Sequence, residues 1–390
     1  MSKEIYIYSG ISPGKKGTGN FLTFFLKQFQ KNNIDYKLIT YATPNTSYIS
    51  IIAKKLGVIK IIRSAYLFVL RFFSGSEINN SIVFIFHPQS IGLEKTTKII
   101  KNNKVYFYVL DTFFFCKKSY NHISGNGPCF KCISNPNASK ENNCNFSIFN
   151  HKDKNYDDFQ NAIYENLDTI TFLTQNHNQK LLLKEKFGDN IDVKELGMLI
   201  DLPEDRAEKD DSKLSYDFVF HNTGLKSKGI EYFIKIAKRM VNHSFLIPYN
   251  SFDINSDIKD FQNIDNIDFI SMSWETGLKT AVANCKVVIN PSLWSAPVEG
   301  ALLKSIKYNG CVAIVPGDFS FQKEIPLDTV IHLDTDIIKS VKKLTSILTS
   351  KISIENYKIK SLKWLNSFQN NTELNFKSFF ESLKNYQKHN

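Results

Sequence analysis

Apolar and polar positions alternate along the chain in a pattern typical of strands connected by helices. In the first half, apolar runs predict strands at 5–9, 36–42, 82–87, 104–111 and 169–174. Amphipathic stretches between them predict helices at 20–30, 94–101, 157–166 and 178–186. Strands that alternate with helices favour βαβ units and a parallel sheet. We therefore expect an α/β domain over residues 1–200.

The same alternation restarts in the second half, after a charge-dense segment. Residues 201–212 (DLPEDRAEKDDS) predict a linker between domains. Strand and helix patterns then recur over 213–370, which we interpret as a second α/β domain. We expect the remaining segment, 371–390, to be a C-terminal helix that packs back on the N-terminal domain. Two such domains place a cleft between them, and ligands of open α/β sheets bind at the carboxyl ends of the strands.

The segment 116–150 interrupts the first domain and shows no periodicity. It contains four cysteines with the spacing C-x12-C-x2-C-x11-C, namely Cys116, Cys129, Cys132 and Cys144. A CxxC pair flanked by two outer cysteines can place four thiolates tetrahedrally around a metal ion. Zinc is the first candidate, an iron–sulfur cluster is less favoured, and reduced thiols without a metal are the remaining alternative. A metal held by four cysteines would be structural, because its coordination shell is closed.

Composition and charge limit the kinds of protein to which this chain can belong. The 390 residues are 42% hydrophobic, which excludes a disordered chain. The net charge of +11 is concentrated in one half: residues 1–195 hold 25 Lys and Arg against 15 Asp and Glu, and the other 195 residues hold 24 against 23. This excess favours an anionic partner for the N-terminal half. The sequence begins without the pattern of a secretory leader, so we expect a cytoplasmic protein.

One stretch suggests contact with a membrane. Residues Ile51–Ser76 contain five Lys and Arg, several Leu and Phe, and no acidic residue. Basic and apolar residues together on helices are typical of peripheral binding to an anionic membrane, here the inner membrane. The alternative is a partly buried helix pair with a solvated basic edge. The charge excess of this half favours the membrane.

Two features of the N-terminal domain suggest ligand binding. The loop after the first strand carries Gly17, Thr18 and Gly19. Glycines let the backbone approach a ligand closely, and the helix that follows offers free N–H groups to a phosphate. The alternative is a flexible connecting loop. His87 ends the third predicted strand, where it could face a bound ligand, although a structural histidine is the more common situation.

Two motifs in the C-terminal domain suggest a site for a diphosphate and for a ligand with hydroxyl groups. The segment from His221 to Gly229 ends a strand and contains Asn222, Thr223 and Lys228. A lysine next to helix-start amides can neutralise a diphosphate, whereas the alternative is a solvated basic turn.

The second of these motifs runs from Asn290 to Ser305. It carries Trp294, Glu299, Gly300 and Lys304 around the start of an apolar helix. Glu299 could accept hydrogen bonds from ligand hydroxyls, with its charge favoured by the helix dipole. The alternatives are a carboxylate that only caps the helix and a tryptophan that belongs to the core.

Together these motifs resemble the glycosyltransferases of the GT-B fold, and most closely glycosyltransferase family 4. Four elements carry the resemblance, in order along the chain: Gly17 and Gly19; Leu110-Asp111-Thr112-Phe113-Phe114-Phe115-Cys116; Thr223 with Lys228-Gly229; and Pro291-Ser292 through Lys304. The resemblance implies two Rossmann-like domains with parallel sheets facing a central cleft. The acceptor would bind the first domain and the donor the second.

The chain departs from the family pattern at several functional positions. The family histidine before Asp111 is Leu110 here, and the family arginine is Thr223. The two glutamates of the Glu-x7-Glu element fall on Ala296 and Lys304, while Glu299 lies three residues past the first slot. We expect Glu299 to substitute for the missing carboxylate.

The resemblance implies transfer of a sugar from a nucleotide-diphosphate sugar to a glycan or lipid-linked glycan, with retention of anomeric configuration. Asp111 and Glu299 are the implied catalytic carboxylates, and catalysis would need no cofactor. The implied setting is bacterial capsule, lipopolysaccharide or O-antigen synthesis. One alternative is an inactive GT-B scaffold, which the missing glutamates motivate. A second is a basic Cys-cluster protein that binds nucleic acid. We expect no nucleic acid, because the basic residues form no compact module and the C-terminal motifs would be unexplained.

Overall fold

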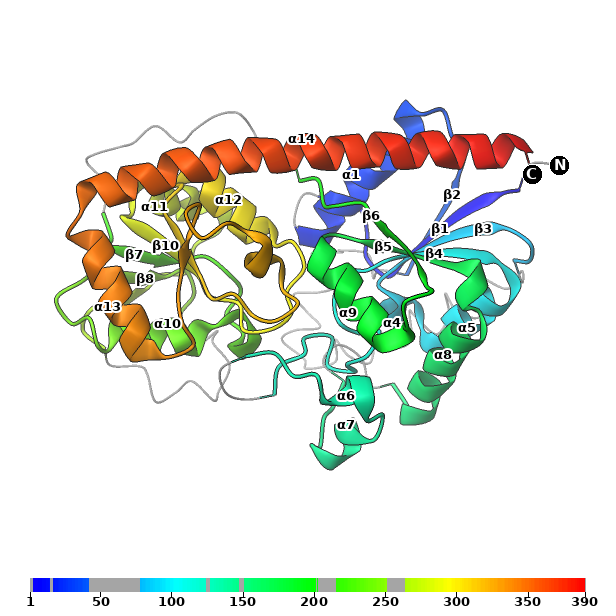
Figure 1. Ribbon diagram of the computed structural model, residues 1–390, viewed down its shortest axis with the longest axis horizontal. Helices are drawn as coiled ribbons and strands as arrows, with labels where there is room; N and C mark the ends of the chain where they lie inside the picture. Colours follow the sequence, from blue (N-terminus) through cyan, green and yellow to red (C-terminus); the bar gives the residue numbers. More distant parts are fainter. Residues whose placement is uncertain are drawn as a thin grey trace, which may run out of the picture.

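The computed structural model describes residues 3–14, 17–41, 78–123, 127–146, 151–200, 202, 215–250 and 264–389. Two α/β units lie side by side and one long helix runs along both (Figure 1). The stretch Ile51–Ser76 lies outside the described residues, as does the expected linker 201–212 apart from residue 202. Within the described ranges, no helix combines the length and apolar character needed to cross a bilayer.

The N-terminal unit is built on a parallel sheet of six strands. Their order across the sheet is β2 (Lys37–Thr40), β1 (Ile5–Ser9), β3 (Ile82–Phe86), β4 (Lys104–Tyr108), β5 (Ile170–Thr174) and β6 (Asp192–Glu195). The helices are α1 (Gly17–Lys31), α4 (Pro88–Ile91), α5 (Leu93–Asn102), α6 (Lys131–Ser134), α7 (Ala138–Glu141), α8 (Asp153–Glu165) and α9 (His177–Phe187), with the 3-10 turn η1 (Leu167–Thr169).

The C-terminal unit repeats this plan with a second parallel six-stranded sheet. Its order is β12 (Ile331–His332), β11 (Val312–Ile314), β10 (Val287–Asn290), β7 (Phe218–Phe220), β8 (Phe245–Ile247) and β9 (Ile267–Phe269). The helices are α10 (Ile230–Ala237), α11 (Leu278–Asn284), α12 (Gly300–Tyr308) and α13 (Ile337–Leu348), with the turns η2 (Lys226–Lys228), η4 (Trp274–Thr276) and η5 (Phe321–Glu324). The expected α/β class with two parallel sheets is confirmed.

The central strands are apolar throughout because both faces of each sheet are covered. All five residues of β3 are buried, and side chains from its two faces enter separate core clusters. Parallel sheets with helices on both faces require such continuous apolar strands. Edge strand β6 is different, because its sequence Asp-Val-Lys-Glu is mostly exposed. It joins the sheet through backbone pairing with β5, which hydrophobic pattern alone could not indicate.

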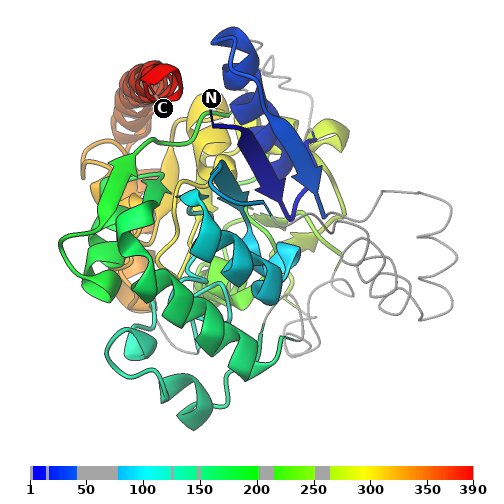
Figure 2. The same cartoon turned by 90° about the vertical axis from the view of Figure 1, so that its right-hand side faces the viewer.

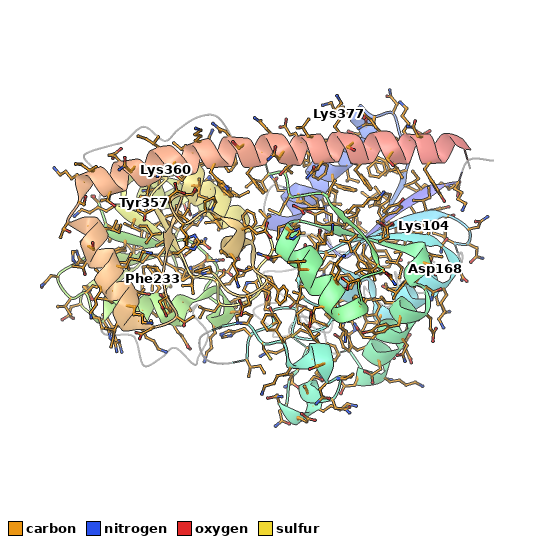
Figure 3. The ribbon with its side chains drawn as sticks, viewed as in Figure 1. Lys104, Asp168, Phe233, Tyr357, Lys360 and Lys377 are labelled. Atoms are coloured by element: carbon orange, nitrogen blue, oxygen red, sulfur yellow. The ribbon has the colours of Figure 1, made fainter. Side chains whose placement is uncertain are left out.

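Helix α14 (Lys351–His389) ties the two units together. Its first half packs on the C-terminal domain, where Leu365 is fully buried. Its second half contributes four residues to the N-terminal core, namely Phe376, Phe379, Phe380 and Leu383. The expected boundary between 370 and 371 therefore falls inside one continuous helix. Figure 2 views this helix almost along its axis, and Figure 3 labels Lys360 in its first half and Lys377 in its second half.

Strand order decides which loops meet. The order reverses between β1 and β3 in the first sheet, and between β7 and β10 in the second. At such a switch point the two following loops diverge to opposite faces and leave a crevice at the carboxyl ends of the strands. These loops begin at Gly10 and His87 in the N-terminal domain, and at His221 and Pro291 in the C-terminal domain.

Candidate active site

Lys228 and Glu299 lie together at the switch point of the C-terminal sheet. Lys228 ends η2, which follows β7, and Glu299 immediately precedes α12, which follows β10. The Lys228 ammonium donates a hydrogen bond to Glu299 Oε1, and the two side chains are only 11% and 7% exposed. Glu299 Oε2 accepts from Ser292 Oγ at 2.6 Å and from Gln322 Nε2 at 3.0 Å. The carboxylate is therefore held by three donors in a nearly dry environment.

Gly229 permits this approach of the two loops. Its φ is +79°, a conformation that side-chain-bearing residues rarely adopt. A Cβ atom at this position would lie 1.9 Å from the carbonyl oxygen of Pro291. Any larger residue would push the β7 loop away from the β10 loop, and with it Lys228 away from Glu299.

Two aromatic rings cover the lysine. The Lys228 Nζ atom lies 4.5 Å from the ring centroid of Trp294 and 5.3 Å from that of Tyr120. The two rings meet edge to face at 4.7 Å. Tyr120 comes from the N-terminal domain, so this cluster forms where the domains face each other. Burial, and then the charges of Asp111 and Glu299, raise the pKa of Tyr120 to about 12.

Asp111 faces this cluster from the N-terminal domain. It follows β4, and its carboxylate accepts hydrogen bonds of 2.8 Å from the Phe113 backbone and from Gln89 Nε2. His87 Nε2 lies 3.8 Å from the same carboxylate. Burial raises the pKa of Asp111 to about 7, although these hydrogen bonds and the Lys228 charge act in the opposite direction. A carboxyl group with such a pKa can hold or release a proton near neutrality.

Three buried polar atoms around this cluster have no hydrogen-bond partner in the described part of the chain. They are Gln89 Oε1, Trp294 Nε1 and Gln322 Oε1. Orphaned buried groups are uncommon in folded proteins and call for an explanation. The three side chains contact Asp111, Lys228 and Glu299 respectively.

The glycine loop of the N-terminal domain leads from β1 into α1. Gly17 has a φ of +51° and begins α1, with Thr18 and Gly19 in its first turn. Gly10 lies so close to Ser90 that a Cβ atom would be 2.1 Å away, which brings the loop after β1 against the loop that carries His87.

A second lysine, Lys304 of α12, lies over a different tryptophan. Lys304 Nζ lies 4.7 Å from the ring centroid of Trp274, and His221 stacks on this tryptophan at 5.2 Å. Burial, followed by the Lys304 charge, lowers the pKa of His221 to about 3, so the imidazole is neutral and contacts Ser305 Oγ at 2.8 Å. Lys228 and Lys304 therefore lie over two different tryptophans.

The other donor-side candidates differ in exposure. Asn222 is buried and donates to Ser292 Oγ at 3.0 Å, so it supports the β10 loop. Thr223 is exposed and its backbone donates to Asn222 Oδ1. Gly300 opens α12, where a Cβ atom would lie 4.0 Å from Met198. The sequence did not indicate Gln89, Tyr120 or Gln322, because their spacing to the motifs shows no regularity.

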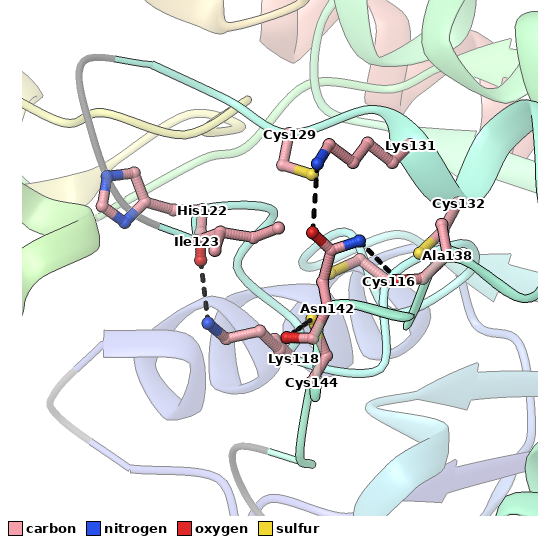
Figure 4. Close-up of a pocket in the computed structure, with 10 residues that line it drawn as sticks. All are labelled: Cys116, Lys118, His122, Ile123, Cys129, Lys131, Cys132, Ala138, Asn142 and Cys144. Atoms are coloured by element: carbon pink, nitrogen blue, oxygen red, sulfur yellow. Dashed lines mark hydrogen bonds between the residues drawn. The ribbon is translucent and has the colours of Figure 1, made fainter. Parts of the chain in front are cut away.

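The four cysteines of the 116–150 segment line one small cavity of about 10 Å³ (Figure 4). All four are free thiols, as are the buried Cys285 and Cys311. Within the described ranges no group of three or more His, Cys, Asp or Glu side chains is arranged to hold a metal ion. The expected cysteine ligands are thus neighbours in space without forming a ready coordination site.

Solved structures share this two-domain arrangement. HepE (Alr3699) of Anabaena in complex with UDP matches with a TM-score of 0.60 at 9% identity, over 98% of this chain and 100% of that chain. Sucrose-phosphate synthase from Thermosynechococcus elongatus matches with a TM-score of 0.58 at 10% identity, over 97% and 100%. A UDP-forming trehalose-phosphate synthase from Burkholderia vietnamiensis matches with 0.58 at 10%, over 99% and 98%. A comparison with protein-family models gives no match, and a comparison with curated proteins gives none either. The fold is that of the GT-B glycosyltransferases.

Proposed function

We propose that this protein is a glycosyltransferase, similar to family 4, that moves a sugar from a nucleotide-diphosphate sugar to a glycan or lipid-linked acceptor. The observation that carries the proposal is the Lys228–Glu299 pair at the switch point of the C-terminal sheet, where the Lys228 charge also acts on Asp111 of the N-terminal domain. The solved structure of HepE that matches this chain is described as a complex with UDP, which makes UDP the first nucleotide and UDP-sugars the first donors to test.

The donor side supplies fixed positive charge for the leaving diphosphate. Lys228 holds Glu299 with one N–H and has two further N–H groups to offer, and the first amides of α12 open beside it. Fixed donors in a site that excludes water stabilise developing negative charge more strongly than water does. Glu299, held by Ser292 and Gln322, would accept hydrogen bonds from hydroxyls of the donor sugar.

The transfer breaks the bond between the anomeric carbon and the diphosphate oxygen, whose electron pair leaves with the diphosphate. A new bond forms between the anomeric carbon and an acceptor hydroxyl oxygen, whose proton passes to the departing diphosphate. Asp111, when ionised, would orient the acceptor by accepting a hydrogen bond from it. Attack on the face that the diphosphate leaves retains the anomeric configuration, as the family resemblance implies.

The charge of the N-terminal half supports an acceptor used in the synthesis of surface polysaccharides. The N-terminal half carries the excess of positive charge, which favours an acceptor linked to a pyrophosphate lipid at an anionic membrane. Co-sedimentation with vesicles containing anionic lipid at low salt tests this part. Failure to bind would leave the transfer reaction in place and remove the membrane-linked acceptor.

Calorimetric titration with UDP, GDP and ADP tests the donor site. Lys228→Met removes a charge-assisted contact worth about 1.5–3 kcal/mol, so we expect the dissociation constant to rise about 10-fold to 100-fold. Lys226→Met is the matched control, because Lys226 lies in the same turn η2 but pairs with Glu231. Equal affinity of wild type and Lys228→Met for the bound nucleotide, or no binding of any of the three, would contradict the proposal.

Nucleotide binding and turnover together distinguish an enzyme from an inactive GT-B scaffold. Lys304 occupies a slot where the family has a glutamate, and Lys228 and Glu299 already neutralise each other. A scaffold would bind the nucleotide diphosphate yet release no nucleotide from any nucleotide-sugar, with or without an acceptor. Turnover that depends on Glu299 would favour the enzyme.

A further inference from the structure

The four cysteines reach one cavity from three parts of the segment 116–150. Cys116 follows the turn after Asp111, Cys129 and Cys132 flank the start of α6, and Cys144 follows α7. Figure 4 shows their sulfur atoms around a common space. The cavity of about 10 Å³ is comparable with the space that one water molecule or one ion takes.

The chemistry of this cavity is that of a soft metal site. Four thiols without a disulfide form a donor set that selects zinc over harder cations. A bound divalent ion would displace the thiol protons, because coordinated cysteine is the thiolate. Lys118 and Lys131 also line the cavity and would offset the negative charge of a four-thiolate site.

The same segment contacts the C-terminal domain directly. Asn121 donates from Nδ2 to Ser295 Oγ at 3.0 Å, and the Ser295 backbone donates back to Asn121 Oδ1 at 2.9 Å. The Cys129 backbone donates to the Asn121 carbonyl at 2.6 Å. Phe130, next to Cys129, meets Phe319 of the C-terminal domain at 5.4 Å between ring centroids. Cys129 is therefore hydrogen-bonded directly to Asn121, the residue that contacts the C-terminal domain.

We propose that Cys116, Cys129, Cys132 and Cys144 bind one zinc ion, and that this ion fixes the segment 116–144 against the C-terminal domain. The sulfur atoms must close in on the ion, because no group of three such side chains in the described part of the chain is yet arranged as ligands. The Asn142 side chain, held by Lys131 at 3.0 Å and by the Ala138 carbonyl at 2.7 Å, lines the same cavity and would shift as they close.

We call the contacts of Asn121 and Phe130 with the C-terminal domain the clasp. Its position matters because Ser295, which Asn121 binds, follows Trp294, and Trp294 covers Lys228. An ordered clasp would hold Trp294 and Tyr120 over the lysine. The metal site itself does not depend on the proposed transfer reaction, since it can be detected with no substrate present.

Elemental analysis of the full chain, purified without chelator, tests the site. We expect about one zinc per chain, with sulfur ligands at about 2.3 Å by X-ray absorption and a tetrahedral spectrum after cobalt substitution. Cys129→Ser and Cys144→Ser should lose the metal, whereas Cys311→Ala, a buried cysteine of the other domain, should keep it. If the variants do not fold, a mercurial reagent added to the wild-type protein should release the zinc.

Several results would overturn the proposal. They are a wild-type protein that neither carries nor takes up zinc, zinc retained after loss of Cys129 or Cys144, and iron with acid-labile sulfide in its place. Hydrogen exchange tests the clasp: removal of the metal should speed exchange at the Ser295 amide, which donates to Asn121. Unchanged exchange there would show that the ion does not hold the two domains together.

Discussion

Replacement of Asp111 by asparagine should make the protein more stable at neutral pH. The Asp111 carboxyl is buried, and its pKa rises from 3.8 to about 7 on folding. This rise spans about 3 pH units, and each unit is worth about 1.4 kcal/mol, so the ionised carboxylate costs the folded state up to about 4 kcal/mol. Asn has nearly the same shape, and a turn of the Gln89 amide, which donates to Asp111 in the wild type, would let the Asn amide donate to Gln89 Oε1.

The sign follows from proton uptake. Between about pH 4 and about pH 7 the folded protein holds the Asp111 proton more tightly than the unfolded chain does. The contribution of Asp111 to the free energy of unfolding therefore falls as the pH rises through this window and is constant above it. The asparagine variant lacks this dependence, so the difference between variant and wild type should grow across the window.

Urea unfolding followed by circular dichroism, repeated from about pH 5 to about pH 8, measures this difference. We expect the variant to gain about 1.4 kcal/mol on the wild type per pH unit, up to a plateau near neutrality. Lys228→Met is an informative second variant, because the Lys228 charge lowers the pKa of Asp111 and its removal should move the window upward. A constant difference across the range would refute the assignment of a raised pKa to Asp111.

Three further predictions follow from the packing. In urea titrations, Lys228→Met should lower the free energy of unfolding by about 3–5 kcal/mol, because it leaves the buried Glu299 unpaired. The double variant Lys228→Met/Glu299→Gln should recover much of this loss. A double variant less stable than the single one would contradict the prediction. Gly229→Ala should separate the β7 and β10 loops, so calorimetry should detect no nucleotide binding to this variant. If the variant bound the nucleotide as tightly as the wild type does, the close contact between Gly229 and Pro291 would be excluded. Phe380→Ala should cost about 3–5 kcal/mol in urea unfolding, whereas Lys377→Ala, exposed on the same helix, should cost little; equal losses would show that α14 does not pack on the N-terminal core.

The predictable part of this fold lies in the strands and helices with strong local patterns. The expected strands at 5–9, 82–87 and 169–174 agree with β1, β3 and β5 to within one residue at each end. Their apolar runs are long because helices cover both faces of the sheet. Strand β6 was missed, because its polar sequence is stabilised by backbone pairing rather than by burial.

Helix α14 shows where local pattern misleads. The second domain was expected to end at residue 370, before a separate helix at 371–390, but the structure has one helix over Lys351–His389. The first half of this helix packs on the C-terminal domain and the second half on the N-terminal domain. Both halves are amphipathic, so no change in composition marks the point where the helix passes from one domain to the other. The packing of Phe376 and Phe380 against Phe25 becomes visible only in three dimensions.

The sequence by itself determined the α/β class, the two repeats of strand and helix, and the residue types at the ends of β7 and β10. It contained the cysteine spacing and both carboxylates, Asp111 and Glu299. Tertiary structure decided what these residues touch. The strand order places the loops of Lys228 and Glu299, 71 positions apart, at one switch point. The facing of two domains then brings Tyr120 and Asp111 to the same place, because contacts between distant segments depend on packing that no local pattern encodes.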